Sequence, residues 1–210
     1  MIKVLVADDH AIVRRGLRQI LAETPDIMVG GEAANAQEVL DLVRGQHWSV
    51  VILDLSLPGS SGLELLADLR KEKPDLRVLV LTVHPEDQYA VRAIRAGAAG
   101  FLTKESAPEK LIEAVRKIAS GGRYVSAELA ETLASALAGE SRGAPHERLS
   151  DREFEILKML ASGKTVSDVA RELTLSVKTV STHRTRILKK MGMKNNAELT
   201  SYAVRNRLVT

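Results

Sequence analysis

The sequence predicts an α/β domain, a doubly wound parallel sheet of five strands, followed by an all-α domain of four helices. Over roughly the first 120 residues, five short apolar runs alternate with segments whose apolar residues recur at helical spacing. From residue 148 onward the apolar period is helical throughout, and no run has the pattern of a strand.

The five apolar runs predict the strands of the first domain. Val50–Leu53 is apolar on both faces, which is typical of a strand buried in a parallel sheet. Between the runs, residues such as Val13, Leu17 and Ile20 share one helical face. Because strand–helix–strand units cross over in one hand, such a chain forms a parallel sheet with helices on both faces. The predicted strands are Ile2–Ala7, Ile27–Gly30, Val50–Leu53, Val78–Leu81 and Ala99–Leu102.

The chain divides into three predicted parts. Residues 1–121 form the α/β domain, residues 122–147 connect, and residues 148–210 form the helical domain. A helix is expected from Ser126 to Ala138, and residues 139–146, with glycines, a proline and no apolar period, predict a flexible linker. Polar residues supply N-caps at the four later helix starts, which are Ser150, Thr165, Ser176 and Asn195.

The charge of the chain is unevenly distributed. The formal net charge is +3. Residues 148–210 hold 13 Lys and Arg against 6 Asp and Glu, whereas residues 1–147 hold 17 against 21. The basic C-terminal part indicates that this part binds a polyanion.

Composition also limits the chemistry and the location. The chain has no cysteine, which excludes disulfides and thiolate metal sites and agrees with a reducing compartment. The first apolar run is too short for a signal peptide, and no run approaches the length of a membrane span. We therefore expect a cytoplasmic protein that does not bind a membrane.

Polar residues of complementary types follow the predicted strands. The acids Asp8, Asp9 and Asp54 follow two of them, and Thr82 and Lys104 follow two others. Because the carboxyl ends of parallel strands lie at one edge of a sheet, these side chains are expected to converge. A carboxylate can attack phosphorus, clustered carboxylates can hold Mg²⁺, and an ammonium can neutralise a phosphoryl group.

This ordered set resembles the receiver domain of two-component response regulators, whose sheet is flavodoxin-like. The resemblance implies that Asp54 is the phosphoacceptor, with Thr82 and Lys104 acting on the phosphoryl group. It implies a Mg²⁺ ion held by Asp9, Asp54 and the Ser56 backbone carbonyl, with Asp8 acting mostly through water. Phe101 falls at the aromatic switch position of the family. The domain is then not an enzyme, although it accepts a phosphoryl group and autodephosphorylates.

The C-terminal part contains a short-turn helix pair. The two helices are predicted over Thr165–Leu173 and Ser176–Met191. Apolar residues form the inward faces, whereas the opposite face of the longer helix is polar and basic. Such a face suits a helix-turn-helix that enters the major groove of DNA. The residues on that outer face are Lys178, Ser181, Thr182, Thr185 and Lys189.

This part resembles the LuxR-type helix-turn-helix. The similarity includes Leu149–Glu153, Lys178-Thr179-Val180 and Ile187. With the receiver, the whole chain is similar to NarL/FixJ-family response regulators. If this helix binds DNA as the helix of that family does, Ser181, Thr182 and Thr185 contact the bases. The DNA phosphates are then bound by Lys178, Thr179, Arg184, Arg186 and Lys189.

The predicted function is that of a response regulator transcription factor. A sensor histidine kinase, or a small acyl phosphate, phosphorylates Asp54, and this controls homodimerisation and binding to double-stranded DNA. Two alternatives are a phosphorylation-independent DNA-binding regulator with a vestigial receiver, and a haloacid-dehalogenase-like phosphatase. The phosphatase requires a second acid two residues after Asp54, where Ser56 stands.

Overall fold

The computed structural model describes residues 1–58, 61–137 and 144–209. The chain forms two compact units, Met1–Ala138 and Gly139–Thr210. The first unit takes in most of the segment 122–147 that the sequence assigned to the connection between the two domains. Each unit is described by itself.

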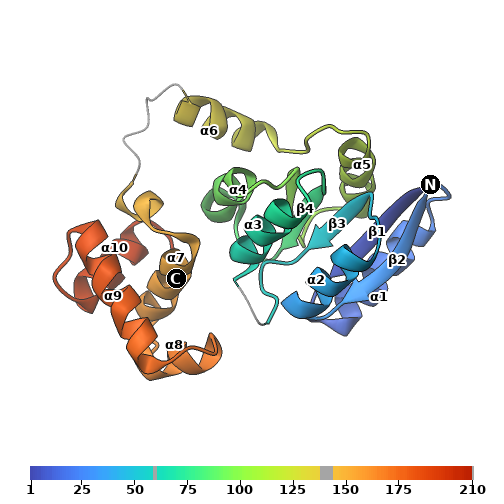
Figure 1. Ribbon diagram of the computed structural model, residues 1–210. Helices are drawn as coiled ribbons and strands as arrows, with labels where there is room; N and C mark the ends of the chain where they lie inside the picture. The colour runs from blue at the N-terminus through green and yellow to red at the C-terminus, as the bar shows by residue number, and fades with distance from the viewer. Residues whose placement is uncertain (59–60, 138–143, 210) are drawn as a thin grey trace. The chain divides into compact units, whose positions relative to one another are not determined.

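The N-terminal unit is built on a five-stranded parallel sheet (Figure 1). Its strand order is β2-β1-β3-β4-β5, which is the doubly wound arrangement predicted from the sequence. The order reverses between β1 and β3, and open α/β sheets bind their ligands at such a point, beyond the strand ends. The strands are β1 (Ile2–Ala7), β2 (Ile27–Ala33), β3 (Val50–Leu53), β4 (Val78–Thr82) and β5 (Gly100–Thr103).

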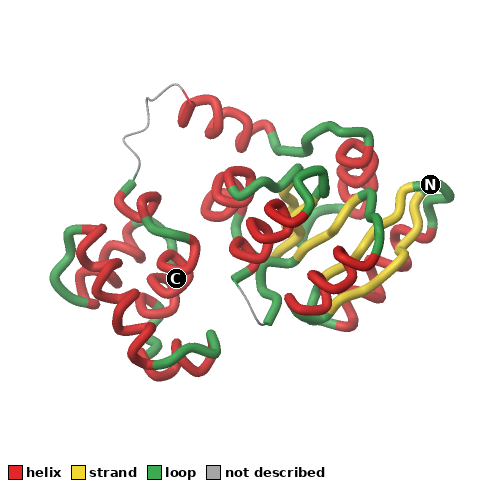
Figure 2. Tube along the Cα trace, viewed as in Figure 1, coloured by secondary structure: helices red, strands yellow, loops and turns green. Residues whose placement is uncertain are grey.

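Helices cover both faces of this sheet (Figures 1 and 2). On one face, α1 (Ala11–Ala22) and α5 (Pro108–Ala119) share a buried core with Val6, Ile52 and Leu79. Side chains alternate along a strand, so the neighbouring strand residues face the other side. That side is covered by α2 (Ala36–Gly45), α3 (Gly62–Glu72) and α4 (Glu86–Arg95).

Strand β2 runs three residues beyond its predicted end at Gly30. The glycine pair ends no strand but makes room for neighbours. A Cβ on Gly30 would lie 2.6 Å from Lys3 Cε, and one on Gly31 would lie 2.7 Å from Trp48 Cη2. The ladder between β1 and β2 shifts its register between Val4 and Leu5. Close packing is strict at Gly31, where a Cβ would meet the Trp48 ring, and less strict at Gly30, where the nearest atom belongs to the flexible Lys3 side chain.

Helix α6 (Ala127–Leu137) belongs to the N-terminal unit and lies inside the predicted span from Ser126 to Ala138. It contacts α4, and Leu129 is buried. The chain leading to it runs beside β5, where Tyr124 N–H donates to the carbonyl of Ala99 at 2.9 Å. The segment that precedes α6 is therefore attached to the edge of the sheet, while the helix itself contacts α4. Much of the predicted linker 139–146 lies outside the described residues.

The C-terminal unit is helical. Phe154, Ile156, Val180, Ile187 and Leu199 are buried in its core. Its elements are a short 3-10 helix (Pro145–Arg148), α7 (Asp151–Ala161), α8 (Val166–Glu172), α9 (Val177–Met191) and α10 (Asn196–Arg205).

Three of the predicted N-caps act as expected, and the fourth differs in part. Ser150 with Glu153 and Thr165 with Asp168 form reciprocal capping boxes, and Ser176 accepts from Thr179 N–H. The Asn195 side chain accepts from Glu198 N–H, but the Glu198 carboxylate turns to Lys194 N–H instead of Asn195 N–H. The helix start is nevertheless where the sequence predicted it.

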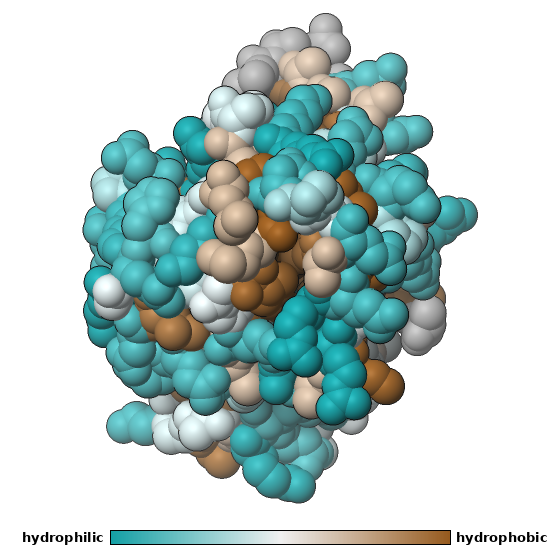
Figure 3. All heavy atoms as spheres, turned by 90° about the vertical axis from the view of Figure 1, so that its right-hand side faces the viewer, coloured by the Kyte–Doolittle hydropathy of each residue, from teal (hydrophilic) through white to brown (hydrophobic). Residues whose placement is uncertain are grey.

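On the face shown in Figure 3, hydrophilic residues predominate and hydrophobic residues gather near its centre. None of the described helices has the length and apolar character needed to span a bilayer.

Candidate functional site

Two carboxylates are fixed at the reversal point of the strand order. Asp8 follows β1 and its N–H donates to the Ala33 carbonyl at 3.1 Å. Asp54 follows β3 and its N–H donates to the Ala7 carbonyl at 2.9 Å. The sheet ladder therefore extends one residue past each strand and orients both side chains. Each carboxylate is only 2% exposed.

Lys104 joins these two acids. Its Nζ lies 2.7 Å from Asp54 Oδ2 and 2.6 Å from Asp8 Oδ2. Burial by itself would lower the pKa of Lys104, but the hydrogen bonds to Asp54 and Asp8 outweigh burial and raise this pKa. Lys104 is therefore a cation at neutral pH and balances part of the charge of the acid pair.

The remaining carboxylate oxygens bind the main chain of their own loops. Asp8 Oδ1 accepts from His10 N–H at 2.8 Å, and Asp54 Oδ1 accepts from Ser56 N–H at 3.2 Å. Each is an Asx-type turn, in which a carboxylate binds the N–H two residues on. Both acids thus have one oxygen on the loop and one on the lysine.

The same edge has the ligands for a divalent metal. One ligand atom from each of Asp8, Asp9, His10 and Asp54 lies within 4.8 Å of the others. Carboxylate oxygens are the ligands that Mg²⁺ prefers, and three acids exceed the single charge of Lys104. The described residues therefore fit Mg²⁺, and Asp9 is the exposed member of the acid set, open to solvent.

Thr82 is fully buried at the end of β4. Its Oγ1 accepts from His84 N–H at 3.3 Å, so the hydroxyl is engaged with its own loop. The Nε2 of His84 lies 3.4 Å from Ser56 Oγ, and the His84 ring is stacked on Tyr89 at 4.3 Å between centroids. The structure thus places Ser56 and His84 side by side beside the acids.

Phe101 is buried in β5, with 1% of its surface exposed. Its N–H donates to the Tyr124 carbonyl at 3.2 Å, which ties this strand to the segment that leads into α6. The main chain of β5 also brings Lys104 to the site, because Lys104 N–H donates to the Thr82 carbonyl at 2.8 Å.

The loop after Asp54 requires a glycine. A Cβ on Gly62 would lie 2.3 Å from Leu55 Cα, which no side chain can occupy. The first residue of α3 therefore packs directly on the backbone that follows the phosphoacceptor candidate.

The C-terminal unit presents a basic helix after a tight turn. Thr174, between α8 and α9, has φ +54°, and Leu175 N–H donates to the Ala170 carbonyl at 2.8 Å. This turn sets the two helices of the predicted helix-turn-helix. The exposed residues of α9 include Lys178, Ser181, Thr182, Thr185, Arg186 and Lys189.

The predicted DNA-contact residues differ in whether their side chains already bind other groups of the protein. Within the described part of the chain, Lys178, Arg186 and Lys189 form no ion pair. Thr182 Oγ1 and Thr185 Oγ1 donate to helix carbonyls at 3.0 Å, whereas Arg184 is half-buried and its Nε donates to Asn196 Oδ1 at 2.6 Å. The pairing with Asn196 attaches Arg184 to α10. Thr179 is half-buried, with its hydroxyl 2.8 Å from Ser176 Oγ.

Family models match both units. "Response regulator receiver domain" matches residues 4–116, and "Bacterial regulatory proteins, luxR family" matches residues 147–203. The chain belongs to the NarL/FixJ family of response regulators. It is a response regulator transcription factor of a two-component system.

The relatives of this regulator match over its whole length. Response regulator GacA of Pseudomonas aeruginosa strain PAO1 is 39% identical over 210 residues, which cover 100% of this chain and 98% of GacA. Response regulator UvrY of Escherichia coli strain K12 is 37% identical over 209 residues, covering 99% of this chain and 96% of UvrY. The two-domain arrangement is therefore shared with curated response regulators.

Two solved structures of response regulators resemble this chain over almost its whole length. RcsB from Salmonella enterica serovar Typhimurium, bound to promoter rprA in the presence of phosphomimetic BeF3-, has a TM-score of 0.69 and 27% identity, covering 96% of this chain and 97% of RcsB. Response regulator ChrA of a heme-sensing two-component system has a TM-score of 0.53 and 33% identity, and the match covers 99% of this chain and 98% of ChrA.

Two residues near the acids of this response regulator were not among the predicted site residues. His10 is exposed, and its Nδ1 lies 2.7 Å from Asp9 Oδ1. Arg14 donates to the main-chain carbonyls of Asp8 and Asp9. In the sequence, His10 could have been noticed only because it follows Asp8 and Asp9, and Arg14 only because it lies one helical turn after His10. Neither feature is specific enough to predict a role at the site.

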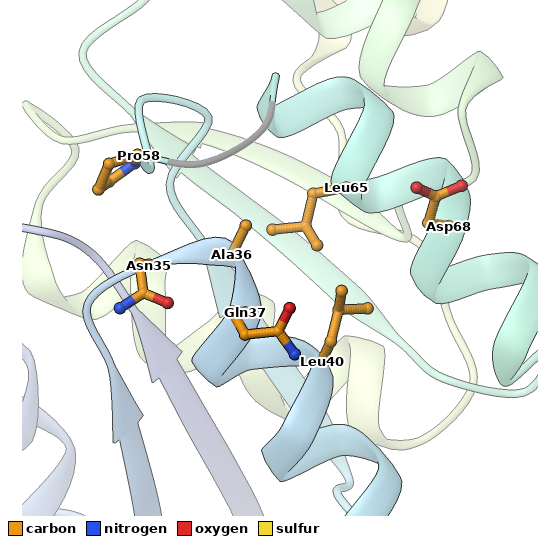
Figure 4. A pocket seen from close by; sticks show the side chains of 7 residues that line it. All are labelled: Asn35, Ala36, Gln37, Leu40, Pro58, Leu65 and Asp68. Atoms are coloured by element: carbon orange, nitrogen blue, oxygen red, sulfur yellow. The ribbon is translucent and has the colours of Figure 1, made fainter. Parts of the chain in front are cut away.

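A separate hollow of about 350 Å³ lies between α2 and α3 (Figure 4). In Figure 4 the Leu40 and Leu65 side chains extend toward each other across it. The lining residues carry no basic group that would bind a phosphoryl group, so it is distinct in chemistry from the acid site. They are Asn35, Ala36, Gln37, Leu40, Pro58, Leu65 and Asp68.

Proposed function

We propose that Asp54 is the phosphoacceptor of this response regulator. An oxygen of its carboxylate forms the new bond to phosphorus while the bond from phosphorus to the donor breaks. Lys104, now 2.7 Å from Asp54, moves onto a phosphoryl oxygen and neutralises its charge. The contact between a buried Asp54 and Lys104 at the strand ends is the observation that supports this role most directly.

Mg²⁺ is the cofactor proposed for this step. Asp9, Asp54 and the Ser56 backbone carbonyl hold it, with Asp8 acting mostly through water. When bound, the ion neutralises charge on the transferred phosphoryl group. The convergence of the acids within 4.8 Å supports the assignment.

Thr82 and Phe101 are proposed to convert phosphorylation into a change of shape. The Thr82 hydroxyl leaves His84 N–H and binds a phosphoryl oxygen, and Phe101 moves with it. Shifting a two-state population from 1:99 to 99:1 requires about 5.5 kcal/mol of differential stabilisation. Charge-assisted hydrogen bonds from Lys104 and Thr82 supply much of this difference.

The proposed output is homodimerisation and binding to double-stranded DNA. RcsB is bound to a promoter in its solved structure, and by the same docking α9 enters the major groove here. A dimer reads half-sites about 10 bp apart, or a multiple of that spacing. Base contacts are assigned to Ser181, Thr182 and Thr185, and phosphate contacts to Lys178, Thr179, Arg184, Arg186 and Lys189.

The phosphodonor is proposed to be a sensor histidine kinase, with small acyl phosphates as substitutes. We further propose that the regulator autodephosphorylates and that it works in the cytoplasm. None of the observations favours the phosphorylation-independent regulator with a vestigial receiver.

Acetyl phosphate labelling tests the proposal. With Mg²⁺, the full chain should take up about one phosphoryl group, and Asp54→Asn should take up none. Asp75→Asn is the matched control, because Asp75 is an exposed acid between α3 and β4. Labelling of the Asp54 variant equal to wild type would refute the assignment, and repeated turnover of phosphoesters would indicate a phosphatase. Unchanged DNA affinity and dimerisation with a phosphoryl analogue would favour the vestigial receiver.

A further inference from the structure

The metal-binding loop is held from its main-chain side by one arginine. Arg14, in the first turn of α1, donates from Nη1 to the carbonyl of Asp8 at 2.7 Å and to that of Asp9 at 3.2 Å. Two successive peptide carbonyls are thus bound by one nitrogen. Their side chains are the acids proposed to hold Mg²⁺.

The guanidinium is in turn anchored to the sheet. Arg14 Nε donates to Glu32 Oε2 at 3.2 Å, and Glu32 pairs with Val6 in the ladder between β1 and β2. The Arg14 side chain is 17% exposed. The planar guanidinium therefore links α1, β2 and the loop after β1 in one rigid contact.

A neighbouring arginine, Arg18, contacts the same glutamate but not the carbonyls of the loop. Arg18 Nη1 lies 3.4 Å from Glu32 Oε1, and its side chain is 58% exposed. No hydrogen bond joins Arg18 to the loop within the described residues. The two arginines share the same acid, and Arg14 alone of this pair reaches the carbonyls.

We propose that Arg14 is a positioning residue for the divalent cation, which rests on the proposed role of Asp8, Asp9 and Asp54 in binding Mg²⁺. By binding both carbonyls, Arg14 fixes the loop backbone, and this orients the Asp8 and Asp9 side chains for the ion before it binds. Without this bond the loop must be ordered when the ion binds, and this ordering weakens affinity. A role through charge alone would be retained by lysine, whose single ammonium cannot span the two carbonyls and Glu32 as the separate Nη1 and Nε of the planar guanidinium do.

Direct metal binding tests the proposal without phosphodonor. Mn²⁺ binding to the full chain, followed by the free-ion signal in electron paramagnetic resonance, should weaken about tenfold in Arg14→Lys and Arg14→Gln, as for other groups that orient metal ligands. Arg18→Gln, which breaks only the contact with Glu32, should bind within about twofold of wild type. Thermal unfolding establishes that each variant is folded.

Two further readouts separate positioning from general damage. Hydrogen exchange of the Asp9, His10 and Ala11 amides should quicken in the Arg14 variants in the absence of metal. In acetyl phosphate labelling, the Mg²⁺ concentration for half-maximal rate should rise about tenfold, while the rate at saturating Mg²⁺ stays within about twofold. Glu32→Gln weakens the bond between Glu32 and Arg14 Nε but leaves the bonds of Arg14 to the loop, so it should lower metal affinity less than the Arg14 variants do. This variant still tests the proposal if Arg14→Gln does not fold.

The outcomes distinguish this proposal from the proposed function. Wild-type affinity in Arg14→Lys would overturn the positioning role, as would equal losses in Arg14→Gln and Arg18→Gln. If the wild-type protein binds neither Mn²⁺ nor a phosphoryl group, the function itself fails and the role of Arg14 fails with it. Wild-type binding that weakens only in the Arg14 and Glu32 variants supports both.

Discussion

The Ser126 hydroxyl donates a 2.6 Å hydrogen bond to Glu86 Oε1. Ser126 immediately precedes α6, and Glu86 begins α4. The same Ser126 oxygen accepts from Leu129 N–H at 3.0 Å, so it caps α6 while holding it to α4. One hydroxyl thus both caps α6 and links it to α4.

Substitutions at this pair should loosen α6. Glu86→Ala removes the attachment and keeps the cap, whereas Ser126→Ala removes both and should cost about 1 kcal/mol more of local stability. Hydrogen exchange of the α6 amides measures the loss. Ser126→Asn keeps an acceptor for the cap and a donor for Glu86, so it should retain most of the protection. Equal exchange in all three variants would contradict the attachment.

Removal of the Lys104 ammonium should destabilise the receiver. Lys104→Met leaves Asp8 and Asp54 adjacent and unpaired. The expected loss is about 2 kcal/mol, below the usual cost of breaking a fully buried pair because Lys104 retains some exposure. Added Mg²⁺ should raise the thermal midpoint more in this variant than in wild type. Lys104→Arg, which keeps the charge, should be intermediate, and a variant midpoint that does not respond to Mg²⁺ would contradict the metal site.

The pH dependence of this contribution follows from the raised pKa of Lys104. Because the folded-state pKa lies above the ordinary 10.5, the stabilisation is complete below pH 10.5 and is lost as pH rises through the folded value. Unfolding in urea between pH 8 and 11 should therefore show the wild type losing its advantage over Lys104→Met only at the alkaline end. A loss already complete at pH 8 would contradict the prediction.

Glu153 should make the C-terminal unit sensitive to acid. Burial alone would raise the pKa of Glu153, but hydrogen bonds from Lys190 and Ser150 outweigh burial and hold this pKa below 4.5. A lowered pKa stabilises the fold above about pH 4.5, and this stabilisation is lost as pH falls through the folded value.

Glu153→Gln tests the sign of this effect. The amide still accepts from Ser150 N–H but has no charge for Lys190. The variant should lose about 1 kcal/mol at pH 7 and should approach the wild type as pH falls below 4.5. Urea unfolding at pH 3.5, 5 and 7 measures the difference. A gap that is constant with pH would show that charge is not the cause.

Thr174 should be a site of backbone strain. Its φ of +54° is unfavourable for a β-branched residue, and Thr174→Gly should stabilise the helix-turn-helix by about 1 kcal/mol. Thr174→Ala keeps a Cβ and should bring little gain. Thermal unfolding of the C-terminal unit within the full chain compares the two. A glycine variant no more stable than the alanine variant would contradict strain at this turn.

The outer face of α9 should separate affinity from sequence preference. Lys178→Ala should weaken binding to all DNA sequences alike and reduce the slope of log affinity against log salt by about 1. Thr182→Ala should instead change the preferred base at one position by about 1–3 kcal/mol. Lys110→Ala removes the same charge from α5 in the receiver and is the matched control. If it lowers the salt slope as much as Lys178→Ala, the phosphate assignment is wrong.

Much of this regulator could be predicted from local pattern. The alternation of apolar runs and helical faces predicted the sheet and its helices, and Val50–Leu53 was predicted with both ends correct. The prediction of β2 ended at Gly30, whereas the strand continues to Ala33, and the glycines at 30 and 31 pack against Lys3 and Trp48. Such a contact joins residues far apart in the sequence and leaves no periodic signal.

The sequence by itself determined the chemistry available at each strand end, since residue type and position relative to an apolar run are both local properties. It could not determine which partners these groups take. The Lys104 bridge to Asp8 and Asp54, the turn of the Thr82 hydroxyl toward His84 and the grip of Arg14 on two carbonyls were decided by the tertiary structure. The reason is that direction and distance between side chains on different strands and helices arise only when the sheet twists and the helices pack against it.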